Sequence, residues 1–170
     1  MIIAYDLETC IMQRGYTRDK ALILEIGAYD LFLDRSFRCF VNPSNEALTK
    51  DNYLSVFEAN GARPYPTKTH AENIRYRPEE ALPLKVAMKQ FLCFLNTAEV
   101  LCAHNGRSFD DKIVHGSLQR CGLEWPKGML FLDSYYDVSK KVWPGRRSYK
   151  LQNLHKALCP EASSLRWHSA

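Results

Sequence analysis

The sequence predicts an α/β domain built in layers around a mixed sheet. Two observations carry this prediction: short strands dominate the first part of the chain, and helices alternate with strands in the last part. The chain has 170 residues, of which 46% are hydrophobic and 25% charged, values typical of a soluble globular protein. We therefore expect residues 1–170 to form a single domain.

The first part contains three β-rich stretches. Residues 2–5 form a short apolar run typical of a buried central strand, and residues 22–33 and 37–41 follow it. The turn sequence Asn42-Pro43-Ser44-Asn45 ends the third stretch. Strands at this spacing predict an antiparallel meander.

The segment 44–78 is rich in polar residues and prolines and predicts a long irregular connection. A short helix around residues 53–60 is its only expected regular element. A loop of this length in a compact domain is often functional, but it can also be a simple surface excursion. Both interpretations remain open from the sequence.

From Glu79 onward the hydrophobic period becomes helical. Leu84, Met88, Phe91 and Leu95 fall on one helical face. The pattern then predicts a strand at 100–103, a helix at 109–121, a strand at 129–132, a helix capped by Asp133 or Ser134, and a last helix at 151–158.

The composition excludes several classes of protein. Lys and Arg number 23 and Asp and Glu 19, so the net charge of +4 permits a polyanionic partner without requiring one. None of the six cysteines forms a C-x-x-C pair, which argues against a zinc ribbon and favours free thiols in a reducing compartment. Asp6 comes too early for a signal peptide, and no apolar run could span a bilayer. These features predict an intracellular protein, in cytoplasm or nucleus, without a membrane partner.

Two carboxylates lie close together at the end of the first strand. Asp6 and Glu8 are two residues apart, so a strand would place both side chains on one face. Paired buried carboxylates repel each other, and a hard divalent cation would relieve that repulsion. The alternative is a frayed strand end in which both acids face water.

A second cluster, His104-Asn105-Gly106-Arg107-Ser108-Phe109-Asp110, joins a short strand to a helix. Asp110 would lie near the helix N-terminus, where the helix dipole favours an anion. The alternative is that Asp110 and Asp111 serve only to start the helix.

The third candidate is His168, in Arg166-Trp167-His168-Ser169-Ala170, after Tyr149-Lys150-Leu151-Gln152-Asn153-Leu154. A histidine beside a metal site can accept a proton from water because its pKa lies near neutrality. A histidine near a chain end can equally be an exposed bystander.

Taken in order, D-x-E, H-N-G-x-x-F-D and R-x-x-H-x-A resemble the motifs of the DEDDh (DnaQ-like) 3′→5′ exonucleases, and the second is closest in form to the TREX-like branch. The resemblance implies an RNase H-like, three-layer fold with a mixed five-stranded sheet. It also implies two Mg²⁺ or Mn²⁺ ions and a DNA or RNA 3′ end as substrate, with release of nucleoside 5′-monophosphates.

The resemblance also assigns roles to residues. Asp6, Glu8 and Asp110 would be metal ligands, with Asp6 bridging both ions, and His168 would be the general base. Leu7 and Thr9 would hold the terminal nucleotide, Asn105 and Phe109 would support the motif, and Asp133 would be a helix cap rather than a ligand.

One element of the family pattern is missing. The fourth acid of these enzymes follows the histidine at a position beyond Ala170, so we expect a chain truncated in its catalytic helix, or a natural form with an impaired metal site. The alternative function is a catalytically impaired nucleic-acid-binding module of the same fold. An RNase H-like endonuclease is a further alternative.

Overall fold

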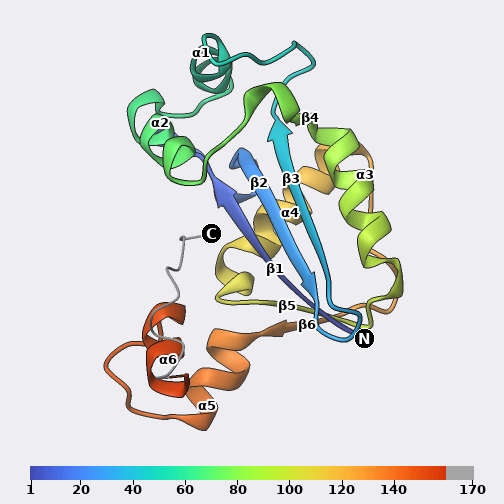
Figure 1. The fold of residues 1–170 in the computed structure, drawn as a ribbon, viewed down its shortest axis with the longest axis vertical. Helices are drawn as coiled ribbons and strands as arrows, with labels where there is room; N and C mark the ends of the chain where they lie inside the picture. Colours follow the sequence, from blue (N-terminus) through green and yellow to red (C-terminus); the bar gives the residue numbers. More distant parts are fainter. Residues whose placement is uncertain (160–170) are drawn as a thin grey trace.

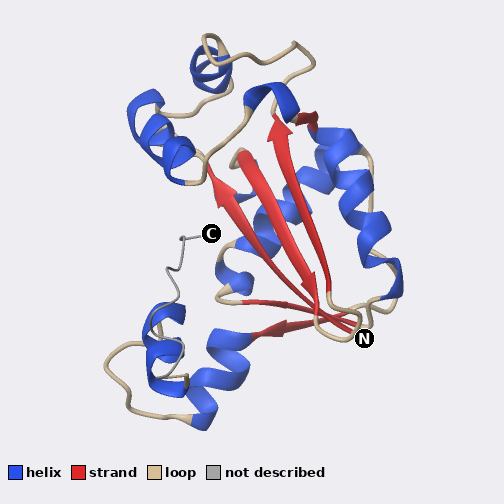
Figure 2. Ribbon diagram, viewed as in Figure 1, coloured by secondary structure: helices blue, strands red, loops and turns tan. Residues whose placement is uncertain are grey.

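The computed structural model describes residues 1–159, and a six-stranded sheet in the order β4-β3-β2-β1-β5-β6 forms its centre (Figures 1 and 2). The strands are β1 (Ile2–Thr9), β2 (Ile23–Asp30), β3 (Arg35–Asn42), β4 (Leu82–Pro83), β5 (Val100–Ala103) and β6 (Leu130–Asp133). β1, β2 and β3 are antiparallel neighbours, whereas β5 runs parallel to β1 and to β6. The predicted antiparallel meander and mixed sheet are therefore confirmed.

The sheet has one strand more than the five predicted. The additional strand, β4, pairs in parallel with Val41 and Asn42 at the end of β3. It is only two residues long and contains Pro83, which has no N–H to donate and is therefore suited to a sheet edge. Two residues give no periodic pattern, and so the sequence did not reveal this strand.

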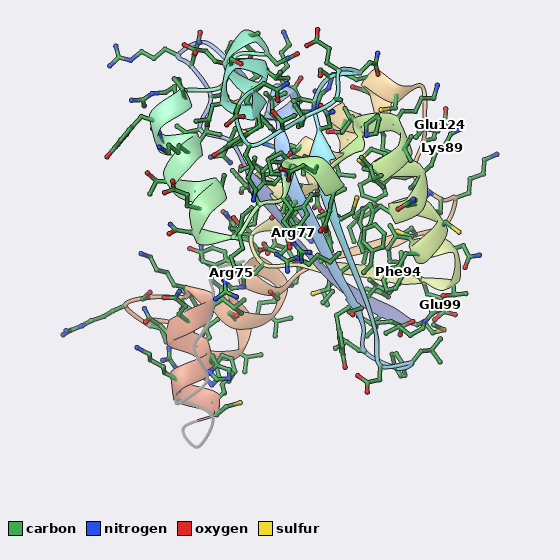
Figure 3. The ribbon with its side chains drawn as sticks, turned by 45° about the horizontal axis from the view of Figure 1, so that its top comes forward. Arg75, Arg77, Lys89, Phe94, Glu99 and Glu124 are labelled. Atoms are coloured by element: carbon green, nitrogen blue, oxygen red, sulfur yellow. The ribbon has the colours of Figure 1, made fainter. Side chains whose placement is uncertain are left out.

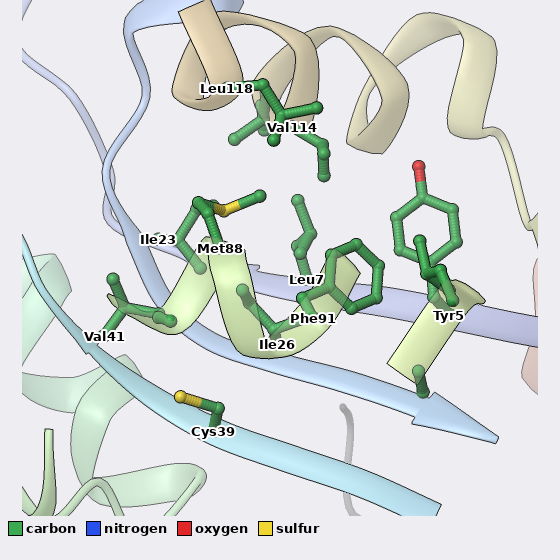
Figure 4. Close-up of a cluster of buried hydrophobic side chains, with 14 of the residues drawn as sticks. Tyr5, Leu7, Ile23, Ile26, Cys39, Val41, Met88, Phe91, Val114 and Leu118 are labelled. Carbon is green, nitrogen blue, oxygen red and sulfur yellow. The ribbon is translucent and has the colours of Figure 1, made fainter. Parts of the chain in front are cut away.

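One face of the sheet is covered by α3 (Leu84–Phe94) and α4 (Asp110–Cys121) (Figure 1). The predicted apolar face of α3 is confirmed, because Met88, Phe91 and Leu95 are fully buried. Figure 4 shows Met88 and Phe91 packed between the sheet and α4, close to Tyr5 and Leu7 of β1.

Alternation along β1 decides which side chains remain for chemistry. Ile3, Tyr5 and Leu7 belong to this core, so Asp6 and Glu8 face the other side of the sheet. The predicted shared face of the two carboxylates follows directly from the burial of their apolar neighbours.

The segment 44–78 is more regular than predicted. It contains the expected α1 (Tyr53–Ala59) and also α2 (Pro64–Asn73), which the irregular interpretation missed. Prolines suggested a loop, but Pro64 and Pro66 occupy the first turn of α2, where a missing N–H breaks no helical hydrogen bond. A second, smaller apolar cluster lies beside these helices and includes Phe57, Leu24 and Ile74.

A close backbone contact joins the loop after β1 to α4. Gly116 lies on the face of α4 that meets this loop, and a β-carbon at this position would lie 1.9 Å from the carbonyl oxygen of Asp19. Arg120, one turn later, donates a 2.5 Å hydrogen bond to the same oxygen. The loop thus rests directly on the helix backbone.

The remaining helical elements connect or follow these parts. They are α5 (Lys140–Val142), α6 (Leu151–Leu158), the 3₁₀ turns η1 (Arg18–Lys20), η2 (Pro78–Glu80), η3 (Leu95–Thr97) and η4 (Gly106–Ser108), and a π-helix, η5 (Ser134–Ser139). Asp133 accepts hydrogen bonds from the amides of Tyr135 and Tyr136, which confirms the predicted cap.

All six cysteines are free thiols, and three of them, Cys10, Cys39 and Cys121, are buried. Within residues 1–159, no helix is long and apolar enough to cross a membrane.

Candidate active site

The polar face of β1 carries the first two predicted residues, Asp6 and Glu8. Asp6 is half-buried, and Glu8 is buried with 7% of its surface exposed. Glu25 of β2 lies directly opposite Glu8 in the antiparallel register, so a third carboxylate adjoins the pair. Like charges in opposed positions of a sheet destabilise it unless each has a partner.

Asp110 reaches this face because β1 is longer than β5. Among the described residues, the ladder between these strands ends at the pair Ala4 and Cys102, which leaves the amide of Leu7 beyond it. That amide donates a 3.2 Å hydrogen bond to Oδ1 of Asp110, the first residue of α4. The contact brings a third predicted ligand to the end of β1.

Burial and mutual repulsion raise the pKa of both aspartates. The pKa of Asp110 rises to about 7, first because of burial and then because of the charge of Asp6. The pKa of Asp6 rises to about 6, through burial and then through Glu8. A cluster of this kind gains stability from any cation placed among the carboxylates.

Glu8 has one satisfied and one unsatisfied oxygen. Its Oε2 pairs with Nε2 of His70 on α2 at 2.5 Å. Its Oε1 is buried and has no hydrogen-bond partner within residues 1–159. The pKa of His70 is raised by its hydrogen bond to Glu8, although partial burial opposes the shift.

The donor chemistry fits a hard divalent cation. Carboxylate oxygens are the preferred ligands of Mg²⁺ and Mn²⁺. A cation here would give the buried Glu8 oxygen a partner and would offset the repulsion that raises the pKa values of Asp6 and Asp110. Within the described part of the chain, however, no three His, Cys, Asp or Glu side chains converge closely enough to hold a metal together. The predicted ligands are therefore neighbours rather than a closed cage.

The other predicted site residues take different places. Leu7 is buried in the core and offers only its backbone, and Thr9 ends β1 with 9% exposure. Phe109 packs against the core, with the guanidinium of Arg18 5.8 Å from its ring centroid. Asn105 has a left-handed backbone with φ of 69°, and its amide donates to Oδ1 of Asp133 at 3.0 Å. His168 lies outside the described residues.

Asp133 serves the backbone. Besides the amides that begin η5, it accepts hydrogen bonds from Asn105 and from Arg107, each at 3.0 Å. These contacts tie the turn after β5 to the end of β6, so Asp133 orders the motif that leads to Asp110.

Two histidines with structural contacts were not singled out from the sequence as site residues. His70 contacts Glu8, as described above. His104, just after β5, hydrogen-bonds to the Ser134 hydroxyl at 2.9 Å and to the Tyr149 carbonyl at 2.8 Å. These contacts hold the segment before α6 against the end of β5. A carbonyl only accepts, so Nε2 of His104 carries the proton. Because His104 directly follows a predicted strand, its place at the strand end could have been inferred from the sequence. No local sequence pattern indicates the contact of His70 with Glu8.

Replacing Asp110 by asparagine is expected to stabilise the metal-free protein at high pH. The raised pKa means that folding penalises the charged form, so wild-type stability falls as pH rises from about 4 to about 7. Asparagine keeps the oxygen that accepts from Leu7 but carries no charge. Thermal melts in chelator at about pH 8 should show a gain of about 1–3 kcal/mol, which disappears near about pH 4.

Asp137→Asn is the matched control for this prediction. The pKa of Asp137 is lowered, first by the backbone amide of Asp133, so its charged form is favoured by folding. This substitution should not stabilise the protein at high pH. An Asp110→Asn variant that melts no higher than wild type in alkaline chelator would contradict the assigned repulsion.

The chain is similar to known exonucleases. The exonuclease model RNase_T matches residues 3–170. The Arabidopsis thaliana exonuclease DPD1, chloroplastic/mitochondrial, is 29% identical over 141 residues, covering 78% of this chain and 39% of DPD1.

Among solved structures, E. coli exonuclease I in complex with a dA16 oligonucleotide has a TM-score of 0.59 at 15% identity, covering 99% of this chain and 37% of exonuclease I. A product-bound exonuclease I has a TM-score of 0.56 at 14% identity, covering 92% and 37%. These likenesses confirm the predicted RNase H-like fold. The chain spans less than half the length of each of these relatives.

Proposed function

Because the chain belongs to the exonuclease family described by the RNase_T model, we propose that it removes nucleotides from nucleic-acid 3′ ends by metal-dependent hydrolysis. The observation that carries the proposal is that Asp6, Glu8 and Asp110 are neighbours near the end of β1, with raised aspartate pKa values and an unpartnered Glu8 oxygen. Clustered acids of this kind are costly in a fold unless a cation uses them.

In this proposal Asp6, Glu8 and Asp110 would hold two Mg²⁺ or Mn²⁺ ions, with Asp6 serving both. When bound, the ions would orient the attacking water and stabilise the leaving 3′-oxygen. His168 would accept the proton of the attacking water. Leu7 and Thr9 hold the last nucleotide, and Asn105 and Phe109 keep the Asp110 turn in place.

The described acids do not provide the fourth acidic ligand. Asp111 accepts a 2.5 Å hydrogen bond from Tyr5, Asp133 is committed to backbone amides, and Asp137 pairs with Arg107 at 2.6 Å. The second candidate function is a nucleic-acid-binding module of the same fold with impaired catalysis. Both candidates use the same face of the sheet and differ in turnover.

The substrate and setting are also part of the proposal. Two of the similar exonuclease I structures hold oligonucleotides, which supports DNA or RNA as the partner. The histidine-dependent type and a TREX-like relationship rest on the motif His104-Asn105-Gly106 with Phe109-Asp110 and on His168. Free thiols support an intracellular site, cytoplasm or nucleus, and the similarity to DPD1, a chloroplastic/mitochondrial exonuclease, adds these organelles.

The test is hydrolysis of labelled oligonucleotides with free or blocked 3′ ends. We expect stepwise shortening of free ends in Mg²⁺ or Mn²⁺, release of 5′-monophosphates, and complete loss in EDTA that added metal reverses. Equal cutting of blocked ends would indicate an endonuclease. Tight binding without turnover would favour the binding module, and activity in excess chelator would contradict the metal-dependent mechanism.

A further inference from the structure

We propose that His70 is a positioning residue that holds Glu8 in the orientation needed for metal binding. This inference rests on the proposed function, because it assigns Glu8 a metal. His70 takes Oε2 of Glu8 at 2.5 Å and leaves Oε1 as the buried oxygen without a partner in residues 1–159. One oxygen anchors the side chain, and the other is kept for the cation.

The neighbouring acid shows that this division is selective. Glu25 lies opposite Glu8, but Arg38 grips both of its oxygens, at 2.5 and 3.0 Å. A bidentate guanidinium leaves Glu25 poorly suited to bind a metal. The two opposed carboxylates thus have separate cationic partners, and of the two only Glu8 keeps a buried oxygen unpartnered.

The helix that carries His70 is fixed to the sheet by independent contacts. Arg38 also donates to the carbonyl of Ile74, just after α2, at 3.1 Å, and the Tyr76 hydroxyl donates to the carbonyl of Val41 at 2.8 Å. Arg77 stacks over Phe40 on this face of the sheet, away from α3, which carries Lys89 and Phe94 (Figure 3). A fixed α2 places His70 at a constant distance from Glu8.

The energetic consequence follows from the behaviour of ligand-supporting groups. A carboxylate ligand that has lost its hydrogen-bonding partner samples other rotamers, and loss of such a partner typically weakens metal binding by about 10–100-fold. His70→Ala should therefore weaken Mn²⁺ binding by about that factor. His70→Gln can present an N–H near the position of Nε2, so it should recover much of the affinity.

The experiment is calorimetric titration of Mn²⁺ into the whole protein and its variants. His115→Ala, an exposed histidine on α4, is the matched control and should bind like wild type. A double-mutant cycle separates positioning from general structural damage: in a Glu8→Gln background, His70→Ala should add little further loss of affinity. Thermal melts check that each variant is folded.

The outcomes are distinguishable. Weaker binding by His70→Ala, recovery in His70→Gln, and no added loss in the Glu8→Gln background support the inference. Wild-type affinity in His70→Ala overturns it, and tighter binding overturns it as well, because His70 would then compete with the metal. Additive losses in the cycle would reduce His70 to a structural role. A wild-type protein that binds no Mn²⁺ would instead overturn the proposed function itself.

Discussion

Asp6→Ala is expected to reduce exonuclease turnover by more than about 10⁴-fold. This loss is larger than the one expected when a general base is removed, which is at most about 10⁴-fold. Asp6 is the ligand proposed to contact both ions, so its loss removes several kcal/mol of transition-state stabilisation, at about 1.4 kcal/mol per tenfold. His168→Ala should cost less, because bulk water or buffer can partly replace a base. Single-turnover assays in saturating Mn²⁺ measure both losses.

Asp51→Ala supplies the control for this comparison, since Asp51 is an exposed acid outside the site. It should retain wild-type turnover. Equal rates for wild type and Asp6→Ala would show that the measured nuclease comes from another site or from a contaminant.

Gly116→Ala is expected to destabilise the fold by about 3 kcal/mol, the upper part of the usual range for overpacking. In an exposed helix the same change would stabilise by about 1 kcal/mol, so the expected sign is reversed. The new β-carbon would meet the Asp19 carbonyl at 1.9 Å, and backbone cannot move aside as a side chain can. The melting temperature should fall by roughly 6–12 °C.

Gln119→Ala, an exposed change on the same helix, controls for altered helix propensity. It should leave the melting temperature nearly unchanged. A Gly116→Ala variant as stable as wild type would mean that the loop after β1 can leave α4 at little energetic cost. Hydrogen exchange of residues 18–20 would then show that release.

The sequence predicted those parts of the fold that have a strong local pattern. Alternation placed Asp6 and Glu8 on one face of β1, and the helical period identified the buried face of α3 through Met88 and Phe91. The Asp133 cap was predicted because a cap depends on neighbours in the sequence. Such signals need no knowledge of distant contacts.

The missed features depend on long-range contacts. β4 exists only because the end of β3 offers it an edge, and α2 was obscured by prolines that its first turn accommodates. The pairing of His70 with Glu8 joins residues that are far apart in the chain, and no local spacing signals it. The pairing of Arg38 with Glu25 also has no local sequence signal. Because Arg38 binds both Glu25 oxygens, Glu8 is the one of these two acids that keeps an unpartnered oxygen.

The unequal lengths of β1 and β5 have a spectroscopic consequence. In an ordinary ladder the Leu7 amide would face a strand carbonyl, but here a titratable carboxylate is its acceptor. Its ¹⁵N and ¹H chemical shifts should therefore follow the charge of Asp110 and respond when a cation approaches that carboxylate. In ¹⁵N-labelled protein, this single amide signal would report occupancy of the site in solution without substrate or turnover.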